Sequence, residues 1–392
     1  MFQEVVIVEG ARTAMVDYMG DFSDVSAIEL GAIAAKEAVR RSGFSPEEFD
    51  HVFMGNALQT SADALYCARH VGLKAGLPVG MPALTVNRLC GSGIESIAQA
   101  AKAILLGEGK VILAGGAENM TQAPHVIRGL RRGLSFGEGH MEDSLWTALR
   151  DTYCGCMMAE TAESLAREQK ISRREQDEFA LQSQKRAKAA EEAGKFREEI
   201  VPVEVQVRKE KKLVSHDTHL RPEMTLEALQ GLPPYFSEDG FVTVGNAFGI
   251  VDGGAAVVAT TVDEMKAKGA KPLGRIVSWA SAGVEPRVMG LGPIPSVRKA
   301  LERASLRLSD IKLFEINEAF AAQYIAVERE LGLDRSRVNV NGGAIALGHP
   351  LGMTGTRLVY TLLKELRRRG GGFGVAAACI GGGQGIAMVV ET

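Results

Sequence analysis

One succession of helix and strand occurs twice in this chain, and this internal duplication constrains its fold more than any other feature. A helical pattern followed by an apolar strand over residues 35–57 reappears over residues 297–317. The two copies align so that Asn56 matches Asn317. A chain built in this way is expected to fold as two similar halves.

The match continues through each half. Gly93 matches Gly355 at nearly the same spacing, and the strand-like runs at 110–116 and 374–380 both lead into glycines. Apolar strands that alternate with helices predict a mostly parallel sheet covered on both faces. Ligands bind beyond the carboxyl ends of the strands in such sheets, so we expect one site between the two halves.

A segment near the middle of the chain, residues 121–245, has no counterpart in the second half. We predict three parts: an N-terminal half made of residues 1–120 and 246–268, an inserted loop domain at 121–245, and a C-terminal half at 269–392. An insertion of this size beside the strand ends is well placed to cover a substrate.

Composition excludes several function classes. The chain has 392 residues, 46% of them hydrophobic, and a formal net charge of −3, with no long basic run. Neither a nucleic acid nor an anionic membrane is therefore an expected partner. No apolar stretch reaches transmembrane length, and the N-terminus shows no basic signal-peptide region, so we predict a cytoplasmic location.

The five cysteines are odd in number and widely spaced, which indicates a reducing compartment rather than a disulfide framework. Cys154 and Cys156 form a C-x-C, but no second pair at zinc-site spacing accompanies them, and the histidines show no metal-ligand spacing. We expect no metal and interpret Cys154 and Cys156 as ordinary loop cysteines, with redox sensing as the alternative.

Cys90 directly precedes an unbroken amphipathic run at residues 94–106. A helix N-terminus presents unpaired N–H groups that favour a thiolate, so Cys90 is interpreted as an activated nucleophile. The alternative is a small, buried apolar cysteine. His349 is enclosed by glycines and a proline, and Cys379 ends an apolar strand before a glycine turn. Both are candidates for proton transfer.

Four motifs in this order closely resemble the thiolase family: Cys90-Gly91-Ser92-Gly93, Asn317-Glu318-Ala319-Phe320, Gly348-His349-Pro350 and Cys379-Ile380-Gly381-Gly382-Gly383-Gln384-Gly385. Residues 115–120, 245–247 and 289–293 extend the resemblance over nearly the whole chain. It implies an α/β class fold: a duplicated βαβαβαββ unit whose two halves have mixed sheets packed in αβαβα layers, plus the inserted loop domain.

The resemblance also implies a reaction. Cys90 takes the acyl group of an acyl-CoA thioester, His349 is its general base, and Cys379 moves the proton of the acetyl Cα or of the CoA thiol. One oxyanion pocket consists of His349 and a water held by Asn317; the other consists of the N–H groups of Cys90 and Gly381. The implied activity is thiolysis of a 3-ketoacyl-CoA, or the reverse Claisen condensation, in fatty acid metabolism. Coenzyme A is substrate and product, with no tightly bound cofactor.

The family pattern places coenzyme A across the insertion. Arg221 would lie at the adenine end, and the residues around the pantetheine arm would be Phe236, Ala247, Ile250 and Phe320. Two positions depart from the pattern. Phe248 replaces a serine that thiolases commonly have, and Met157 replaces the histidine of acetoacetyl-CoA-specific members. Phe248 removes one donor to the pantetheine and changes the tunnel wall, whereas the Met157 pattern is closer to the broader 3-ketoacyl-CoA thiolases.

Other activities stay open at this stage. An acetoacetyl-CoA-specific acetyltransferase is the first alternative. A ketoacyl synthase would carry a second histidine where this chain has Asn317 and Cys379, and a non-catalytic acyl-CoA-binding relative would lack one of Cys90, His349 and Cys379. The resemblance implies a homo-oligomer, either a dimer or a homotetramer, with residues 122–139 as the candidate tetramer contact.

Overall fold

The strands of both halves lie on one hydrogen-bonded path. The computed structural model describes residues 4–207 and 210–392; residues 1–3 of the first predicted domain and 208–209 of the predicted insertion lie outside the described residues. The path runs β14 (Ile311–Ile316), β15 (Phe373–Ile380), β16 (Gln384–Glu391), β13 (Gly274–Gly283), β1 (Val5–Arg12), β12 (Val251–Thr261), β5 (Val111–Glu118), β3 (His51–Gly55) and β4 (Ala83–Val86), with β2 (Val16–Asp17) beside β12.

The duplication read from the sequence is present in this path. The first half has the order β1-β12-β5-β3-β4, and the second half has the order β13-β16-β15-β14. Val338 bridges Phe314 of β14 in the position that β4 holds in the first half. The halves join at β1 and β13 through two residue pairs, Val6 with Arg275 and Ile7 with Gly274.

The expectation of a mostly parallel sheet is wrong, and the mixed sheets implied by the family resemblance are confirmed. Parallel pairing occurs between β14 and β15, β3 and β5, and β3 and β4, whereas the other neighbours on the path are antiparallel. Parallel strands need a crossover, but a tight turn suffices for an antiparallel pair. Gly382 and Gly383, with φ of 82° and 78°, form such a turn between β15 and β16. Strand–helix alternation carries no information about these hairpins.

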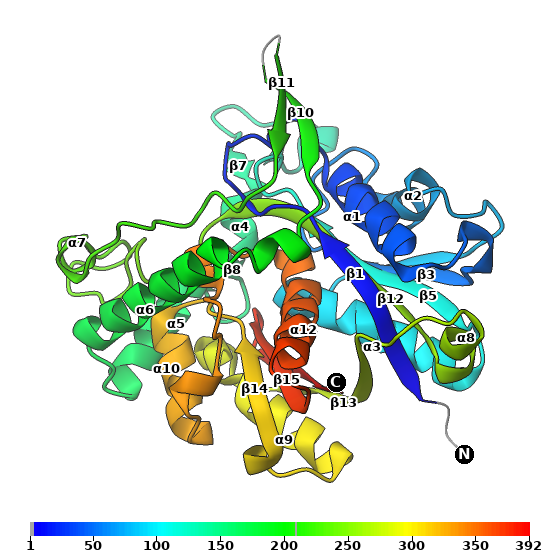
Figure 1. Ribbon diagram of the computed structural model, residues 1–392. Helices are drawn as coiled ribbons and strands as arrows, with labels where there is room; N and C mark the ends of the chain where they lie inside the picture. Colours follow the sequence, from blue (N-terminus) through cyan, green and yellow to red (C-terminus); the bar gives the residue numbers. More distant parts are fainter. Residues whose placement is uncertain (1–3, 208–209) are drawn as a thin grey trace.

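Helices cover both outer faces of the sheets and fill the space between them (Figure 1). The central layer consists of α3 (Ser92–Leu106) and α12 (Leu351–Arg368), and its core includes Ile97 and Leu358 packed against strands of both halves. On the outer face of the first half lie α1 (Ala27–Ser42) and α2 (Cys67–Lys74); the second half carries α9 (Pro293–Ala304) and α10 (Ala321–Leu331). This arrangement is the predicted αβαβα layering.

The two matched glycines, Gly93 and Gly355, lie where α3 and α12 cross. A Cβ added to Gly93 would lie 2.3 Å from the backbone N of Thr356, and one added to Gly355 would lie 2.3 Å from the backbone N of Ile94. Each backbone therefore occupies the space of the other's missing side chain. The two helices touch backbone to backbone, so neither glycine can be replaced without moving them apart.

A carboxylate is buried where β5 ends. Glu118 accepts hydrogen bonds from Asn56 Nδ2 at 3.0 Å, from the backbone N of Ala57 and Leu58 at 3.0 and 3.1 Å, and from the backbone N of Gly352 at 2.8 Å. Burial raises the pKa of Glu118 to about 7 despite these donors. Its bond to Gly352 ties the first half to the start of α12.

The segment between β5 and β12 forms a layer over the strand ends. Its elements are β6 (His125–Ile127), β7 (Met141–Asp143), α4 (Ser144–Ala148), β8 (Arg150–Asp151), β9 (Cys156–Met157), α5 (Met158–Glu168), α6 (Arg173–Glu192), β10 (Val203–Val207), β11 (Glu210–Val214) and α7 (Leu226–Gln230). Two short helices, α8 (Val262–Ala267) and α11 (Ala344–Leu347), lie outside it. The β10–β11 hairpin projects away from the body (Figure 1).

A buried ion-pair network fixes this layer to the first half. Arg12, at the end of β1, bonds both carboxylate oxygens of Asp217 at 2.7 and 2.9 Å and Glu199 at 2.9 Å. All three side chains are buried, so loss of Arg12 would leave two buried carboxylates without their cation.

Among the described residues, no helix combines the length and the apolar character that a bilayer crossing requires.

Candidate active site

Four of the five predicted catalytic residues line one cavity of about 220 Å³. Cys90 follows β4 and lies just before α3, His349 immediately precedes the start of α12, and Cys379 and Gly381 lie at the end of β15. Each therefore stands where a strand ends or a helix begins, which is why segments far apart in sequence meet here. The rest of the lining includes Leu89, Leu149, Asp151, Thr152, Met158, Phe248, Met289, Ala319, Phe320 and Leu351.

A strained turn presents Cys90. Leu89 has a φ of 46°, and the hydroxyl of Ser92 closes the turn by accepting from the N–H of Arg88 at 2.8 Å and donating to the carbonyl of Leu89 at 2.7 Å. A non-glycine residue at positive φ costs conformational energy, and such residues cluster at functional sites. The turn thus fixes the cysteine at the cavity wall.

The thiolate expected from the helix N-terminus is not what the site favours at rest. Burial raises the pKa of the Cys90 thiol to about 11, although the N–H groups of Gly381 and of Cys90 itself lower it. Desolvation of the charged form outweighs these donors. Sequence reasoning saw the helix start but not how much protein surrounds the sulfur; Cys90 as the nucleophile stays a prediction, and the raised pKa favours the thiol as its resting form.

The hydrogen bonds of His349 indicate which ring nitrogen carries the proton. Thr354 Oγ1 donates to the carbonyl of Pro350 at 3.0 Å, so its hydroxyl is free to accept from His349 Nδ1–H at 2.6 Å. Nε2 is then unprotonated and accepts from Asn317 Nδ2 at 3.3 Å. Burial, with the nearby charge of Arg357, lowers the pKa of His349 to about 3. The imidazole is neutral and has a lone pair available on Nε2.

Asn317 and Cys379 complete the inner site. Asn317 is buried, and its Oδ1 has no hydrogen-bond partner among the described residues. A buried, unpaired amide oxygen in a native structure usually has a ligand or water to bind. Burial, with a contribution from Cys90, raises the pKa of the Cys379 thiol. The site therefore holds two neutral thiols and one neutral imidazole.

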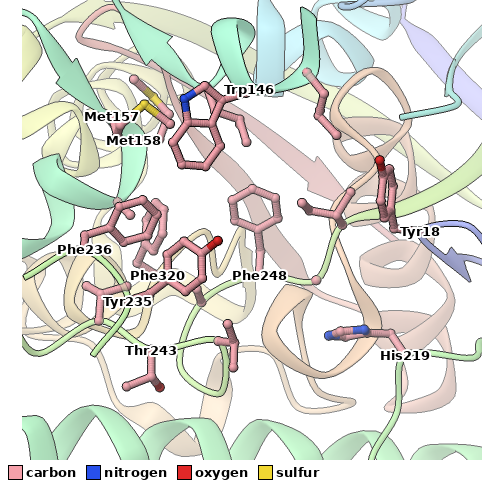
Figure 2. A pocket seen from close by; sticks show the side chains of 18 of the residues that line it. Tyr18, Trp146, Met157, Met158, His219, Tyr235, Phe236, Thr243, Phe248 and Phe320 are labelled. Carbon is pink, nitrogen blue, oxygen red and sulfur yellow. The ribbon is translucent and has the colours of Figure 1, made fainter. Parts of the chain in front are cut away.

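A second, larger cavity of about 720 Å³ adjoins the first, and the two share Leu149, Met158, Phe248 and Phe320 as lining. Figure 2 shows aromatic side chains around it: Phe248 stands at the centre, between Tyr18 on one side and the group of Tyr235, Phe236 and Phe320 on the other. This outer cavity is the channel to the thiols.

All seven predicted substrate-binding residues line this channel: Met157, Arg221, Phe236, Ala247, Phe248, Ile250 and Phe320. Phe248 packs edge-on against His349, with ring centroids 5.2 Å apart, and against Phe320 at 5.8 Å. It forms part of the boundary between channel and inner cavity. Arg221 is half-exposed, and it donates to the carbonyl of Thr218 at 3.0 Å and to Asp17 at 3.3 Å.

Several residues of the site were not anticipated. Thr354 hydrogen-bonds His349, Met158 lines both cavities, and Trp146, Tyr235 and His219 line the channel. The sequence did carry a signal for the pairing of Thr354 with His349: Thr354 lies one helical turn after Pro350, which directly follows His349. The channel side chains had no such signal: Tyr235 and His219 lie in irregular parts of the insertion, and Trp146 lies in the five-residue helix α4. In the described part of the chain, no group of three or more His, Cys, Asp and Glu side chains could hold a metal ion.

Comparison with known proteins gives one consistent result. Residues 5–263 match the family model described as "Thiolase, N-terminal domain", and residues 270–392 match "Thiolase, C-terminal domain". The chain is 50% identical to the human mitochondrial 3-ketoacyl-CoA thiolase, over 100% of this chain and 99% of the relative. It is 47% identical to an acetyl-CoA acetyltransferase of Cupriavidus necator, over 99% of each chain.

Solved structures agree with the sequence comparison. The crystal structure of the human mitochondrial 3-ketoacyl-CoA thiolase superimposes with a TM-score of 0.98 at 50% identity, covering 100% of this chain and 99% of that one. The structure of the human enzyme in complex with CoA superimposes with a TM-score of 0.96, covering 100% of this chain and 98% of that one. An acetyl-CoA acetyltransferase of Bacillus anthracis gives a TM-score of 0.97 at 43% identity, covering 100% and 99% of the two chains.

Proposed function

The chain belongs to the thiolase family, and from this membership we propose that its acyl transfer runs through Cys90, with His349 and Cys379 moving the protons. It is an acyltransferase that moves an acyl group between a 3-ketoacyl-CoA and CoA, with coenzyme A as substrate and product. The observation that supports these roles is the shared cavity, where two thiols and an imidazole meet at the end of an aromatic channel.

Thiolysis divides into two half-reactions. In the first, the Cys90 thiol gives its proton to His349 Nε2, and the sulfur attacks the 3-keto carbon of the substrate. The bond between C2 and C3 then breaks, and Cys379 protonates the departing acetyl-CoA carbanion at its Cα. In the second, Cys379 takes the proton of an incoming CoA thiol, the CoA sulfur attacks the acyl group, and His349 returns its proton to Cys90.

The resting protonation states fix when the proton moves. With the pKa of Cys90 raised to about 11 and that of His349 lowered to about 3, mainly by burial in each case, a stable thiolate–imidazolium pair does not form in the empty site. Proton transfer to Nε2 therefore accompanies sulfur attack, when the charge passes on to the substrate oxygen. Substrate binding is a condition for nucleophile activation.

Two donor sets can receive the developing negative charges. The N–H groups of Cys90 and Gly381 both favour a negative charge at the Cys90 sulfur, and we assign them to the oxygen of the acyl group bound there. For the enolate of acetyl-CoA, we assign the Nε2 edge of His349 together with a water on the unpaired Oδ1 of Asn317. Glycine at position 381 suits the first of these donor sets, because it has no side chain that would keep the acyl oxygen away from the backbone N–H.

Coenzyme A is proposed to lie under the insertion, residues 121–245, with its pantetheine arm along the channel. Phe236, Ala247, Ile250 and Phe320 supply apolar lining, which suits an extended alkyl amide. Arg221 at the rim has a half-exposed guanidinium, held by Asp17 and the carbonyl of Thr218, whose exposed part can stack on an adenine or meet a phosphate. Phe248 offers no hydroxyl to the arm and narrows the passage to the inner cavity.

We propose a preference for 3-ketoacyl-CoA substrates longer than acetoacetyl-CoA, because Met157 and Phe248 make the channel wall apolar near the inner cavity. Purified protein is assayed for CoA-dependent thiolysis of acetoacetyl-CoA, a longer straight-chain and a branched 3-ketoacyl-CoA. A higher kcat/KM for the longer substrates supports the proposed preference. A strong preference for acetoacetyl-CoA would instead identify an acetoacetyl-CoA-specific acetyltransferase.

The nucleophile is tested by trapping the acyl-enzyme. Wild-type protein incubated with acetyl-CoA is expected to gain one acetyl group on the peptide that contains Cys90, as measured by mass spectrometry. Cys90→Ala should lose both the adduct and turnover while its CoA affinity stays near that of the wild type. Cys154→Ser, outside both cavities, is the matched control and should keep both. Unchanged turnover in Cys90→Ala would refute the assignment.

We also propose a homo-oligomer, a dimer through the sheet edge or a tetramer. β4 is the last strand of the path, and Leu84 on it is 50% exposed; exposed edge strands pair readily. Residues 122–139 carry exposed Leu130 and Phe136, which suit a tetramer contact. Light scattering of the wild type and Leu130→Ser tests this: a tetramer that becomes a dimer supports the contact, and a monomeric wild type overturns the oligomer.

The cytoplasm remains our predicted location. Two relatives differ in the cell compartment that they suggest: the human relative is named mitochondrial, and the relative from Cupriavidus necator is a bacterial protein. Immunodetection in fractionated source cells decides between the cytoplasm and an organelle.

A further inference from the structure

Two cysteines outside the active site lie side by side on a surface turn. Cys154, Gly155 and Cys156 connect β8 to β9, and Gly155 turns the chain with a φ of 75°. Cys156 Sγ donates to the carbonyl of Cys154 at 3.6 Å, and the two thiols also interact directly. Both thiols are free. The turn therefore already holds the sulfurs on the same side, as an intraloop disulfide requires.

A basic side chain from another part of the fold faces one of these sulfurs. Arg287, which lies after β13, donates from Nη1 to Cys156 Sγ at 3.4 Å. Cys154, Gly155, Cys156 and Arg287 line a cavity of about 390 Å³, to which Glu160, Glu163, Ser164, Arg167, Phe236 and Ser237 also contribute. The two carboxylates there already accept backbone N–H groups, Glu160 from Met157 and Glu163 from Phe241 and Val242.

Position separates this pair from the other cysteines. Cys67 and Cys379 are buried, whereas Cys90 is partly exposed but lines the inner cavity, where desolvation raises the pKa of its thiol to about 11. Cys154 and Cys156 are partly exposed and border a cavity large enough for a small molecule. A thiol reacts with a disulfide only when it is reachable and can ionise, so this pair meets a soluble oxidant first.

The turn is continuous with the walls of the active site. Arg150 and Asp151 of β8 line the inner cavity together with Thr152, and Met157 of β9 lines the channel. The two strands pair directly, Arg150 with Met157 and Asp151 with Cys156. A covalent bond between the cysteines would constrain the turn that joins these two walls.

We propose that Cys154 and Cys156 are a reversible redox site that reacts with small disulfides of the glutathione type and controls thiolysis through the β8–β9 wall. Cys156, the sulfur beside Arg287, attacks one sulfur of the disulfide and releases one thiol. Cys154 then attacks Cys156 in the mixed disulfide and releases the second thiol. The protein loses two hydrogens, which the two released thiols carry, so the cysteines are oxidised and the small disulfide is reduced.

Mass spectrometry tests the site itself. Reduced full-length protein is incubated with oxidised glutathione and then alkylated and digested. The wild type should yield a peptide with a Cys154–Cys156 bond. Cys154→Ser should instead accumulate glutathione on Cys156, and Arg287→Gln should slow both reactions. Oxidation that occurs first at Cys90, or an unmodified Cys154–Cys156 pair, would overturn the proposal.

Activity measurements test whether the disulfide regulates thiolysis. Thiolysis by the wild type should fall several-fold on oxidation and recover with dithiothreitol. The double variant Cys154→Ser/Cys156→Ser should have the basal rate of the reduced wild type and keep it in oxidised glutathione. An equal loss in the double variant would place the effect at another cysteine, and a disulfide without any change in rate would refute regulation. The disulfide map does not depend on turnover, so it stands apart from the catalytic assignments.

Discussion

The tautomer of His349 depends on one hydroxyl, and Thr354→Val removes it with little change in side-chain shape. In the wild type, Thr354 Oγ1 accepts from Nδ1–H at 2.6 Å and leaves Nε2 as the base. Valine cannot accept, so Nδ1–H becomes a buried donor without a partner. Leaving such a group unsatisfied costs about 1–3 kcal/mol. Because about 1.4 kcal/mol corresponds to a tenfold change in rate, kcat should fall by about 5- to 150-fold.

The assay is steady-state thiolysis together with the rate of acyl-enzyme formation from acetyl-CoA. KM for CoA should stay near the wild-type value, because Thr354 does not line the channel. Thr354→Ser keeps the hydroxyl and is the matched control; it should retain wild-type kcat and pH dependence. Thermal unfolding of both variants shows whether the valine protein is folded. A folded valine variant that turns over as fast as the serine variant would refute the orienting role of Thr354.

Three further outcomes follow from the geometry. Cys379→Ala should still form the acyl-enzyme on Cys90 but lose carbon–carbon bond formation, checked by acetyl labelling and a condensation assay; full condensation activity would exclude the proposed role. Phe248→Ser should open the passage between the cavities and raise kcat/KM for branched 3-ketoacyl-CoA relative to acetoacetyl-CoA by several-fold, and an unchanged ratio would show that the ring does not select the acyl group. Burial raises the pKa of Glu118 to about 7, above its unfolded value of about 4.3, so the folded state holds this proton and loses stability as pH rises through that window, by at most about 4 kcal/mol. Glu118→Gln should flatten that fall in urea unfolding curves, and equal slopes for the two proteins would contradict it.

The sequence predicted the architecture better than the pairing of its strands. The match of Asn56 with Asn317 and of Gly93 with Gly355 was sufficient to predict two similar halves, whereas the αβαβα layering came from the family resemblance. It could not reveal that β16 returns on β15 by a glycine turn, because hairpin partners are set by a few turn residues and not by periodicity.

At the site, residue identities were more predictable than their electrostatics. The segments around Cys90, His349 and Cys379 carry unusual glycine patterns, so they stood out, and the structure brings them to one cavity. The raised pKa of Cys90 depends on how much protein surrounds the sulfur, which no local motif records. Thr354 was missed for a related reason: a hydroxyl in a helix has many possible partners, and tertiary packing selects one.

The buried Glu118 shows how a fused duplication can become asymmetric. The spacing that relates Gly93 to Gly355 also relates Cys90 to Gly352, so the second half offers an equivalent place for a nucleophile. This chain has glycine there, and the N–H of that glycine bonds Glu118, as does Asn56, the counterpart of Asn317. Where Cys90 precedes one central helix as the proposed reacting sulfur, Gly352 at the start of the other central helix donates instead to a carboxylate of the first half, which cross-links strand and helix. The position where the symmetry permits a second nucleophile is therefore used for a structural hydrogen bond between the two halves. One substrate channel serves the single remaining site.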